Sequence, residues 1–470
     1  MSHEVHVNFA GKIVMVGFGS IGQGVLPLIL RHIGTSADRV TIVTADEAGS
    51  AEAAKYGVKF VNGALTRENY RARLEPLLGA GDFLLNLSVD VSSIALVRLA
   101  RERGALYLDT CIEPWAGGYF DGTASVEKRS NYSMRLDALA LRDGQSHPTA
   151  VLTHGANPGL VSHFVKQALL DIARDTEVEA ARPQNREEWG RLAQRLGIKV
   201  IHIAERDTQV SNLPKKQDEF VNTWSVDGFV SEGAQPAELG WGTHERHFPA
   251  DGGKHVQGSR CAIYLNRPGA STRVRTWTPK AGPFHGFLIT HSEAISLADF
   301  FTVRDGDRVT YRPTTHYAYH PSDNAVLSLH EFAGRNWHLQ ENKRIMLDDV
   351  IEGIDELGVL LAGHQKNAYW YGSQLSIEEA RKLAPYNSAT SLQVTVAVLA
   401  GMVWAMENPA RGVVEPDEMD FERPLGICMP YLGTVVGRYT DWTPLEGRGE
   451  LFVEDLDAAD PWQFKNIRVV

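Results

Sequence analysis

A short apolar segment that runs directly into three closely spaced glycines constrains this chain more than any other feature. Residues 13–22 read Ile-Val-Met-Val-Gly-Phe-Gly-Ser-Ile-Gly, and a helical pattern follows over residues 25–33. In such a turn Gly17 permits the sharp exit from the strand, Gly19 lets backbone N–H groups approach a diphosphate, and Gly22 allows the helix to pack on the strand. A purely structural glycine turn is the alternative. Because a strand and a helix flank the turn, the segment favours a dinucleotide-binding site.

The second strand of this unit, Val40–Val43, bears on which cofactor binds. An acid at the end of this strand usually binds the ribose hydroxyls, but Thr44 follows here and Asp46 is the nearest acid. Asp46 could reach the ribose or could be a solvated turn residue. No arginine stands beside the strand end to receive a 2′-phosphate, so the sequence favours NAD over NADP. The expected cofactor contacts on these two segments are Gly17, Gly19, Ser20, Ile21, Gly22, Thr44 and Asp46.

The composition indicates a globular protein with more than one domain. The chain has 470 residues, of which 43% are apolar, enough for two or three hydrophobic cores. The net charge of −11 argues against a general nucleic-acid binder and against binding to anionic membranes, and it is compatible with cationic ligands. We therefore expect neither nucleic acid nor a membrane among its partners.

Cysteine usage and the N-terminus indicate a reducing compartment. Cys111, Cys261 and Cys428 are odd in number, far apart and without metal-ligand spacing, so neither a disulfide framework nor a metal site is expected. The first residues include Glu4 and His6 and lack the apolar core of a signal peptide. No uninterrupted apolar stretch approaches the length of a membrane span. The sequence predicts a cytoplasmic protein.

Up to about residue 155 the chain alternates apolar strands with helical patterns, which is the layout of a doubly wound parallel sheet. The expected strands are Ile13–Val16, Val40–Val43, Phe83–Leu87, Leu106–Asp109 and Ala150–Thr153. We therefore assign residues 1–155 to a Rossmann-type α/β domain that binds NAD, and residues 156–470 to an α+β catalytic domain.

The second domain has a different texture. Its strand-like segments, separated by Gly and Pro turns, are Lys199–Ile203, Phe220–Val226, Ala262–Leu265, Arg273–Trp277 and Gly286–His291. Helical periodicity returns over residues 389–406, whose small and apolar side chains predict a buried helix that could pack back onto the first domain. The stretch from Pro409 is rich in Pro, Gly and acids and predicts an ordered but irregular tail.

Polar residues follow the strands of the first domain, where the ligand crevice of an open α/β sheet lies. Asn86 or Ser88 is expected to face the nicotinamide, and Asn157 could hydrogen-bond its carboxamide. Each of these residues, taken singly, could instead cap a helix or form a turn. The candidate contacts at these strand ends are Asn86, Ser88, Asp90, Thr110 and Asn157, with Glu113 beside them.

The second domain carries several carboxylates close to an aromatic residue. Two pairs of ionisable residues have a spacing of two, which in a strand puts both side chains on one face: Glu205 with Asp207, and His291 with Glu293. A solvated sheet face is the alternative for either pair. Trp224 lies close in sequence to Asp227 and Glu232. An aromatic face among carboxylates forms a receptor for an ammonium ion, to which the cation–π interaction contributes about 0.5 to 2 kcal/mol.

Eight segments together resemble bacterial homospermidine synthase, a family related in fold to saccharopine dehydrogenase. They are Val-Gly-Phe-Gly-Ser-Ile-Gly-Gln-Gly, Asn-Leu-Ser-Val-Asp, Glu-Pro-Trp, Gly-Ala-Asn-Pro-Gly, Ile-His-Ile-Ala-Glu-Arg-Asp-Thr-Gln, Phe-Val-Asn-Thr-Trp-Ser-Val, Pro-Ala-Glu-Leu-Gly-Trp-Gly-Thr and Lys-Asn-Ala-Tyr-Trp-Tyr-Gly-Ser. The similarity extends from about residue 10 to the C-terminus. The sequence departs from the family pattern at Thr44, where that pattern leads us to expect the acid that binds the ribose.

The resemblance implies an activity and a site. Members of that family form homodimers and use bound NAD to oxidise putrescine, release ammonia, couple the oxidised carbon to a second amine and return the hydride. The resemblance therefore implies the coupling of two putrescines, or of putrescine and spermidine, to homospermidine, with release of ammonia or 1,3-diaminopropane. It also implies that residues 156–470 bind substrate and form the dimer. Carried over by motif, the active-site residues are Glu113, Asn157, Glu205, Trp224, Glu232, His291 and Glu293.

The chemistry of a diamine substrate explains these residue types. Putrescine is a dication, so carboxylates must bind both ends, and a base must remove a proton from the amine before hydride can leave. Glu205, or His291 held by Glu293, could take that proton. The coupling could instead use an enzyme lysine, for which Lys166 and Lys366 are candidates. Because surrounding carboxylates raise the pKa of a lysine and suppress its attack, we expect no covalent enzyme imine.

Two other functions would use the same framework. An NAD(P)H-dependent imine reductase of the saccharopine or carboxynorspermidine dehydrogenase type has carboxylated substrates and should offer an arginine clamp. The candidate segments contain only Arg206, whose side chain alternates away from Glu205. A non-catalytic NAD sensor would have no use for clustered acids beside the nicotinamide crevice.

Overall fold

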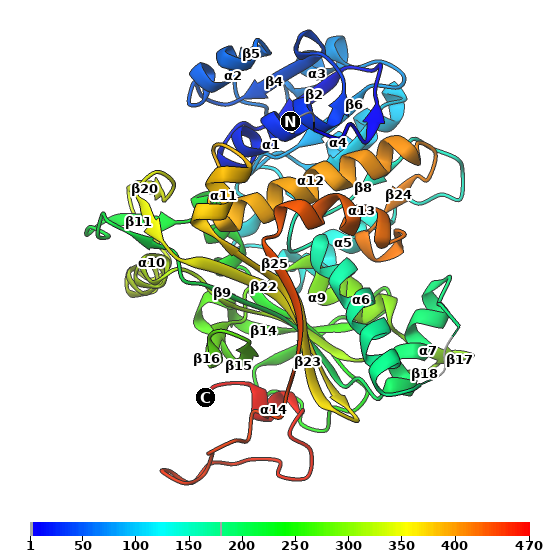
Figure 1. The fold of residues 1–470 in the computed structure, drawn as a ribbon, viewed down its shortest axis with the longest axis vertical. Coiled ribbons are helices and arrows are strands. Elements are labelled where there is room, and N and C mark those ends of the chain that lie inside the picture. The colour runs from blue at the N-terminus through cyan, green and yellow to red at the C-terminus, as the bar shows by residue number, and fades with distance from the viewer. Residues whose placement is uncertain (1–2, 179–180) are drawn as a thin grey trace.

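A parallel sheet of seven strands forms the N-terminal part of the fold in the computed structural model, which describes residues 3–178 and 181–470 (Figure 1). Its strand order is β24-β8-β7-β6-β2-β4-β5. The strands are β2 (Ile13–Val16), β4 (Val40–Thr44), β5 (Lys59–Asn62), β6 (Phe83–Asn86), β7 (Leu106–Asp109), β8 (Ala150–Val151) and β24 (Val413–Val414). β2, β6 and β7 are buried along their whole length, as expected for parallel strands with helices on both faces.

The order of these strands puts a topological switch point between β2 and β6. β4 and β5 extend the sheet on one side of β2, whereas β6, β7 and β8 extend it on the other. Ligands of open α/β sheets bind beyond the carboxyl ends of the strands at such a point. The helices of this region are α1 (Ser20–His32), α2 (Ser50–Tyr56), α3 (Tyr70–Leu74), α4 (Ser93–Arg103) and α5 (Asn131–Leu139).

The predicted Rossmann-type sheet is confirmed, with additions at both edges. All five expected strands are present, although the one expected over residues 150–153 ends at Val151. The alternation of patterns does not predict β5 or β24. Because β24 comes from residues 413–414 and pairs with β8, the N-terminal sheet draws an edge strand from far beyond residue 155.

The long helix α12 (Ala389–Glu407) lies between the two sheets of the molecule. It packs against α1 and β7 on one side and against β22 and β23 of the second sheet on the other (Figure 1). By length and composition it could cross a membrane, although Gln393 and Thr395 interrupt its apolar run. Nearly all of its residues are buried inside the fold, where one hydrophobic cluster joins Phe83, Val359 and Leu399. α12 thus ties both sheets into one core.

A mixed sheet of ten strands forms the second part, with the main path β13-β14-β12-β19-β9-β22-β23-β25. β9 pairs in parallel with β19 and antiparallel with β22, so the side chains of these three strands are held in a fixed register. The strands are β9 (Val200–Asp207), β12 (Pro236–Gly240), β13 (Gly252–Lys254), β14 (Ala262–Pro268), β15 (Arg273–Thr278), β16 (Gly282–Phe287), β19 (Thr314–His320), β22 (Ile354–His364), β23 (Asn367–Ser376) and β25 (Thr434–Thr440).

Helices and short strand pairs surround this sheet. α6 packs on β22 and β23, and α9 packs on β12 and β19. The helices are α6 (Leu160–Asp175), α7 (Arg186–Leu196), α8 (Val226–Ala234), α9 (Ser292–Phe300), α10 (Asp323–Gly334), α11 (Ile377–Leu383), α13 (Glu422–Cys428) and α14 (Phe464–Ile467). The short pairs are β1 (Val7–Asn8) with β3 (Ile33–Gly34), β10 (Val210–Ser211) with β21 (Val350–Glu352), β11 (Glu219–Asn222) with β20 (Asn342–Ile345), and β17 (Val303–Asp305) with β18 (Arg308–Tyr311).

Three expectations for the second part need correction. The strand expected over residues 220–226 ends at Asn222, and the strand expected over residues 286–291 ends at Phe287, because helices α8 and α9 begin just beyond these points. The stretch from Pro409 is also more regular than its composition suggests. It contains β24 and β25, which join different sheets, and helices α13 and α14.

Candidate active site

The glycine turn leaves room for an anion at the N-terminus of α1. Gly17 has a φ of 89°, and a Cβ atom there would lie 2.7 Å from the backbone of Leu87. A Cβ atom at Gly22 would lie 2.9 Å from the carbonyl oxygen of Gly17, so a glycine is needed for close packing. At Gly19 a Cβ atom would meet nothing within 4 Å. Because α1 has no side-chain cap and no acid in its first turn, its terminal N–H groups are available to an anion.

A long cleft runs over this turn and past the ends of β4 and β6. The residues that line it include Gly17–Ile21, Thr44–Asp46, Gly63–Thr66, Leu87–Val91, Ser225–Asp227, Lys343 and Ile345. Asp46 lines the cleft and also shapes its own loop, because its Oδ1 accepts a hydrogen bond from the backbone N–H of Ala48 at 2.9 Å. No arginine is among the described residues that line this cleft.

Asn86 and Ser88 have different positions although both follow β6. Ser88 lines the cleft, whereas Asn86 is buried and lines neither cavity of the site. The Oδ1 of Asn86 accepts a hydrogen bond from the Ser88 hydroxyl at 2.6 Å, and its Nδ2 donates to the Tyr107 hydroxyl at 3.3 Å. Tyr107 in turn donates to Asp109 at 2.8 Å. Asn86 therefore supports the loop, and Ser88 is the residue of the two that a ligand can reach.

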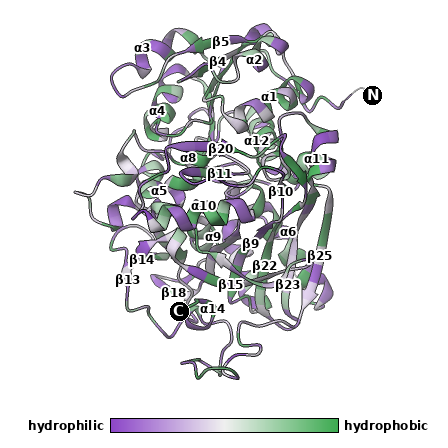
Figure 2. Ribbon diagram, turned by 90° about the vertical axis from the view of Figure 1, so that its left-hand side faces the viewer, coloured by the Kyte–Doolittle hydropathy of each residue, from purple (hydrophilic) through white to green (hydrophobic). Residues whose placement is uncertain are grey.

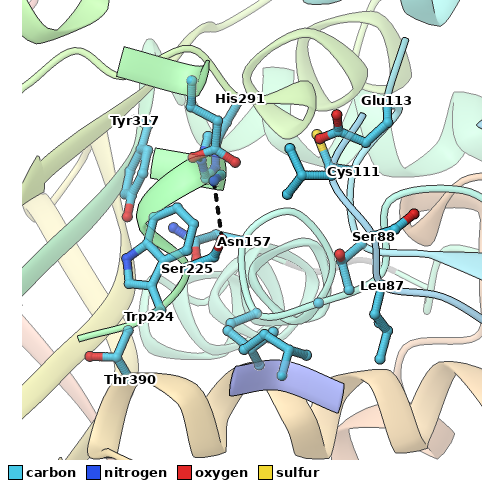
Figure 3. Close-up of a pocket in the computed structure, with 18 of the residues that line it drawn as sticks. Leu87, Ser88, Cys111, Glu113, Asn157, Trp224, Ser225, His291, Tyr317 and Thr390 are labelled. Carbon is cyan, nitrogen blue, oxygen red and sulfur yellow. Dashed lines mark hydrogen bonds and ion pairs between the residues drawn. The ribbon is translucent and has the colours of Figure 1, made fainter. Parts of the chain in front are cut away.

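The cleft continues into a second cavity between the two sheets, which we call the acidic chamber. The two cavities share Ile21, Leu87, Ser88, Val89 and Ser225. The chamber is further lined by Thr110, Cys111, Glu113, Asn157, Glu205, Trp224, Glu232, His291, Tyr317 and Thr390, among others. Trp224 and Tyr317 lie on one side of it, and Ser88 and Glu113 lie on the other (Figure 3). Both parts of the molecule therefore contribute to its wall.

Glu205 near the end of β9 is buried and hydrogen-bonded on one oxygen. Its Oε2 accepts bonds from the Tyr317 hydroxyl at 2.5 Å and from the Asn157 amide at 3.0 Å. Burial raises the pKa of Glu205 to about 7, although the bond from Tyr317 opposes the shift. The side chain of Glu205 can therefore change its protonation state near neutral pH.

His291 is held between two carboxylates. Its Nε2 lies 2.9 Å from Oε2 of Glu232, and its Nδ1 lies 3.2 Å from Oε1 of Glu293. Burial opposes a charge on this ring, but the two carboxylates raise the pKa of His291 well above its usual value. Both ring nitrogens therefore carry protons and donate them. The strand geometry expected for this pair is wrong, since His291 is the N-cap residue of α9 and Glu293 lies in its first turn, behind the chamber wall.

Glu113 lies on the opposite wall, beyond the end of β7. One of its oxygens accepts a hydrogen bond from the backbone N–H of Asp90 at 3.1 Å, and its own N–H donates to the Ser93 hydroxyl at 3.0 Å. Burial raises the pKa of Glu113 to about 8. Asp90 itself lines the outer cleft rather than the chamber.

Trp224 lies in the loop between β11 and α8, not in a strand. Its indole N–H donates to the hydroxyl of Tyr319 at 3.3 Å, which anchors the edge of the ring. The side chain is only partly buried and lines the chamber together with Glu205, Asn157 and Tyr317. An aromatic face is therefore available in a cavity that contains several carboxylates.

Sequence reasoning missed several chamber residues that other elements supply. Tyr317 comes from β19, Thr390 from α12, and Cys111 from the loop after β7. Asp207 and Asp355 form a buried layer next to Glu205, and they face each other in the β9–β22 register. Burial raises the pKa of both aspartates. The spacing of two from Glu205 indicates Asp207, but no local pattern connects Tyr317 or Asp355 with the site.

Neither candidate lysine lines the chamber. Lys166 on α6 is buried, and its Nζ donates to the carbonyl oxygen of Met419 at 2.8 Å. Burial lowers the pKa of Lys166 to about 8, but this ammonium group is directed into the packing of α6. Lys366 lies in the β22–β23 turn with its Nζ 4.8 Å from the centre of the Tyr439 ring.

Comparison with known proteins places the chain in a family. A family model for the saccharopine dehydrogenase NADP binding domain matches residues 13–151, and one for the saccharopine dehydrogenase C-terminal domain matches residues 155–441. A homospermidine synthase of Blastochloris viridis is 56% identical over 470 residues, covering 99% of this chain and 98% of the relative. The chain belongs to the homospermidine synthase family.

Two further relatives agree with this placement. The homospermidine synthase of Mesorhizobium japonicum is 54% identical over 473 residues, with 99% of this chain and 98% of the relative covered. The crystal structure of the homospermidine synthase from Legionella pneumophila, in complex with NAD, superposes with a TM-score of 0.93 at 50% identity and covers 98% of each chain. This chain therefore shares its fold with that homospermidine synthase over nearly the full length of both chains.

Proposed function

We propose that this enzyme couples two molecules of putrescine, or putrescine and spermidine, to homospermidine. Ammonia, or 1,3-diaminopropane, is released, and NAD serves as a hydride carrier that is regenerated in each cycle. The observation that carries the proposal is the continuity of the cleft, which leads from the glycine turn directly into a chamber with Glu113, Glu205, Glu232 and Trp224 on its walls. The names of three relatives at 50 to 56% identity support it.

The residues at the turn fit NAD. The open position at Gly19 and the uncapped N-terminus of α1 suit its diphosphate, and Thr44 and Asp46 lie where its adenosine ribose would reach. Ser88 and Asn157 line the passage into the chamber, where the nicotinamide would lie. The absence of arginine among the described lining residues favours NAD over NADP. NAD, when bound there, supplies an acceptor for hydride from the amine carbon and later returns that hydride.

The chamber suits a diamine because its polar groups are carboxylates. Putrescine carries two ammonium groups, and the carboxyl groups of Glu232 and Glu113 can each accept a hydrogen bond from one of them. An ammonium group beside Glu113 lowers the pKa of this side chain from about 8 and so favours its anion. His291 neutralises part of the negative charge of Glu232 and Glu293. The ammonium groups of the substrate would balance the negative charge that remains. The face of Trp224 adds a cation–π contact that lets a cationic intermediate move without being fixed by an ion pair.

Glu205 is the group we propose as the base. Its pKa of about 7 matches a proton acceptor at neutral pH, whereas both nitrogens of His291 already donate to carboxylates. Glu205 takes a proton from the reacting ammonium so that hydride can leave the adjacent carbon. The resulting imine carbon is attacked by the second amine, ammonia leaves, and hydride returns to the substituted imine. No lysine is needed, and none of the described chamber residues is a lysine.

An imine reductase for carboxylated substrates fits the chamber poorly. Such substrates need a cationic partner for each carboxylate, and His291 is the only cationic side chain among the described residues that line the chamber. His291 already serves Glu232 and Glu293. We therefore interpret the similarity to saccharopine dehydrogenase as one of fold and not of substrate.

The test of the function is product analysis with putrescine and a trace of NAD. We expect homospermidine and ammonia in equal amounts, many turnovers for each NAD, and no accumulation of NADH absorbance. A requirement for one NAD or NADH per product would favour the reductase. Borohydride added during turnover, followed by intact-mass measurement, tests the route: an adduct on Lys166 or Lys366 would contradict a non-covalent coupling.

We also propose that the protein is a cytoplasmic homodimer. Cys111, Cys261 and Cys428 are free thiols, which fits a reducing compartment. Three strongly exposed apolar residues, Leu451, Phe452 and Val453, lie in the segment before α14 that projects from the body of the molecule (Figure 1). A partner surface would cover such a segment. Light scattering on the purified protein measures the mass directly, and a monomer at micromolar concentration would rule the dimer out.

A further inference from the structure

The outer cleft receives one short strand from the second part of the molecule. β20 pairs in parallel with β11 and lies beneath the N-terminal sheet, beside α8 (Figure 2). Side chains alternate along a strand, and here Lys343 and Ile345 line the cleft whereas Arg344 points elsewhere, toward Glu219 and Asp349. A basic and an apolar side chain from β20 therefore share the cleft with the glycine turn.

The charges in this cleft are unbalanced for a ligand that contains a diphosphate. Among the described residues that line it, Asp46, Asp90 and Asp227 are acidic, and Lys343 is the only lysine or arginine. The N-terminus of α1 offers backbone N–H groups but only a partial positive charge. Each of the three acids repels a diphosphate, so a full positive charge in the cleft has a specific use there.

In the described structure Lys343 already pairs with a carboxylate on the protein surface. Its ammonium group pairs with Asp227, the second residue of α8, and both side chains are about half exposed. An ion pair of this exposure contributes little to stability, so the lysine can exchange one anion for another at low cost. A flexible four-carbon stem allows that movement without a change of the backbone.

We propose that Lys343 leaves Asp227 and binds the diphosphate of NAD, so that the second part of the molecule supplies a full positive charge to the outer cleft. The inference rests on the proposed NAD-dependent function. It assigns cofactor affinity to a residue about 320 positions away from the glycine turn in the sequence. Asp227 then acts as a competitor of the diphosphate for the same ammonium group.

The competing explanation is that Lys343 and Asp227 only latch β20 to α8. The two explanations predict opposite results for the two partners. If the pair is a latch, removing either charge removes the same interaction, and both variants change NAD affinity in the same direction. If Lys343 serves the diphosphate, removing Lys343 weakens binding of NAD, whereas removing Asp227 strengthens it, because the lysine is released and a repelling charge is lost.

The experiment is calorimetric titration of the apoenzyme with NAD and with ADP-ribose, which keeps the diphosphate and lacks the nicotinamide. We expect Lys343→Gln to weaken both ligands about tenfold, at the low end for a charged hydrogen bond because the lysine is partly exposed. Lys343→Arg should stay within about twofold of the unmodified enzyme. Asp227→Asn should tighten both ligands, and this gain should shrink in the double variant. Lys366→Gln, which removes a lysine outside both cavities, is the charge-matched control.

The outcomes separate this inference from the function on which it rests. If the unmodified enzyme forms homospermidine and binds NAD, but Lys343→Gln binds NAD equally well, the inference is wrong and the function stands. If both single variants weaken NAD binding by the same factor, the latch is correct. If the unmodified enzyme does not bind NAD, the proposed function itself fails. Thermal unfolding without NAD verifies that each variant is folded, and raising the salt concentration should reduce the difference between Lys343→Gln and the unmodified enzyme.

Discussion

The glycine turn and the acidic chamber lie in two connected cavities and offer a ligand different chemical groups. At the turn, Gly17 and Gly19 leave backbone N–H groups open to a ligand, and the side chains of Ser20 and Ile21 beside them are only partly buried. In the chamber, the groups are buried side chains such as Glu205 and Glu113. Backbone amides do not titrate near neutral pH, whereas burial moves the pKa values of the two glutamates to about 7 and about 8. The turn should therefore bind its ligand independently of pH, and the chamber should not.

This difference also separates what each end contributes to the reaction. The outer cleft holds a ligand by charge and shape, so damage there should appear in cofactor affinity. In the proposed reaction the chamber binds cationic amines and transfers their protons, so damage there should appear in turnover and in amine affinity at saturating NAD. A cleft variant that changes turnover, or a chamber variant that changes cofactor affinity, would contradict this division.

Replacing the proposed base should have the largest effect. Glu205→Gln keeps the hydrogen bond from Tyr317 but cannot accept a proton, and we expect kcat to fall by about a hundredfold to ten-thousandfold. The affinity for ADP-ribose, which lacks the nicotinamide, should not change. Glu245→Gln is the matched control, because Glu245 is a buried glutamate whose pKa burial raises to about 7, yet it bonds to Thr314 and Phe464 outside both cavities. Comparable losses in both variants would show that burial, not base chemistry, is being measured.

Removing the charge of Glu232 should have the next largest effect. Glu232→Gln keeps the shape of the side chain but loses the anion that holds His291 and faces the substrate. The transition state should therefore lose about 1.5 to 3 kcal/mol of stabilisation, which lowers kcat/KM for putrescine. Steady-state kinetics at saturating NAD measures this. An unchanged kcat/KM would remove Glu232 from the amine site.

The ring of Trp224 tests whether the chamber recognises a cation through an aromatic face. Trp224→Phe keeps a ring and should retain much of the activity, whereas Trp224→Ala should lose up to about thirtyfold in kcat/KM, the upper value for a desolvated cation–π contact. Circular dichroism confirms that both variants are folded. If the two variants lose equally, the indole N–H bond to Tyr319, rather than the ring face, is what matters.

The smallest expected effect is a difference in pH dependence between the chamber and the glycine turn. The pKa of Glu205 is raised to about 7, so Glu205 is mostly neutral at pH 6 and mostly ionised at pH 8, and kcat/KM for putrescine should rise about tenfold over that interval. The dissociation constant of ADP-ribose, which lacks the nicotinamide, should stay flat. In Glu205→Gln, the increase of kcat/KM near pH 7 should be absent.

Stability should respond to pH in the opposite sense. Because the folded state holds the Glu205 proton more tightly than the unfolded chain does, its contribution to folding is complete below the unfolded pKa and is lost as pH rises through about 7. Thermal melts between pH 5 and pH 8 check the sign. A stability contribution of Glu205 that grew with pH would contradict the raised pKa.

The turn was predictable because its signal is local. A strand, three glycines and a helix are consecutive in the chain, and their conformations follow from steric rules that act over a few residues. The carboxylates of the chamber were also predictable as a set, through the family resemblance and the spacing of Glu205 and Asp207. The backbone conformation at Trp224 and at His291 was not predictable in this way, because the expected strands end earlier and helices α8 and α9 begin just after these residues.

By itself, the sequence determined the parallel sheet, the cofactor turn and the acidic character of the site, since each depends on neighbouring residues or on residue type. Only the tertiary structure decided which groups meet. Tyr317 reaches Glu205 across 112 positions, and His291 reaches Glu232 across 59. Those contacts and the burial of the side chains raise the pKa of Glu205 to about 7 and that of His291 well above its usual value, which is why we propose Glu205, not His291, as the base. Protonation is a property of the packed environment, which no local stretch of sequence contains.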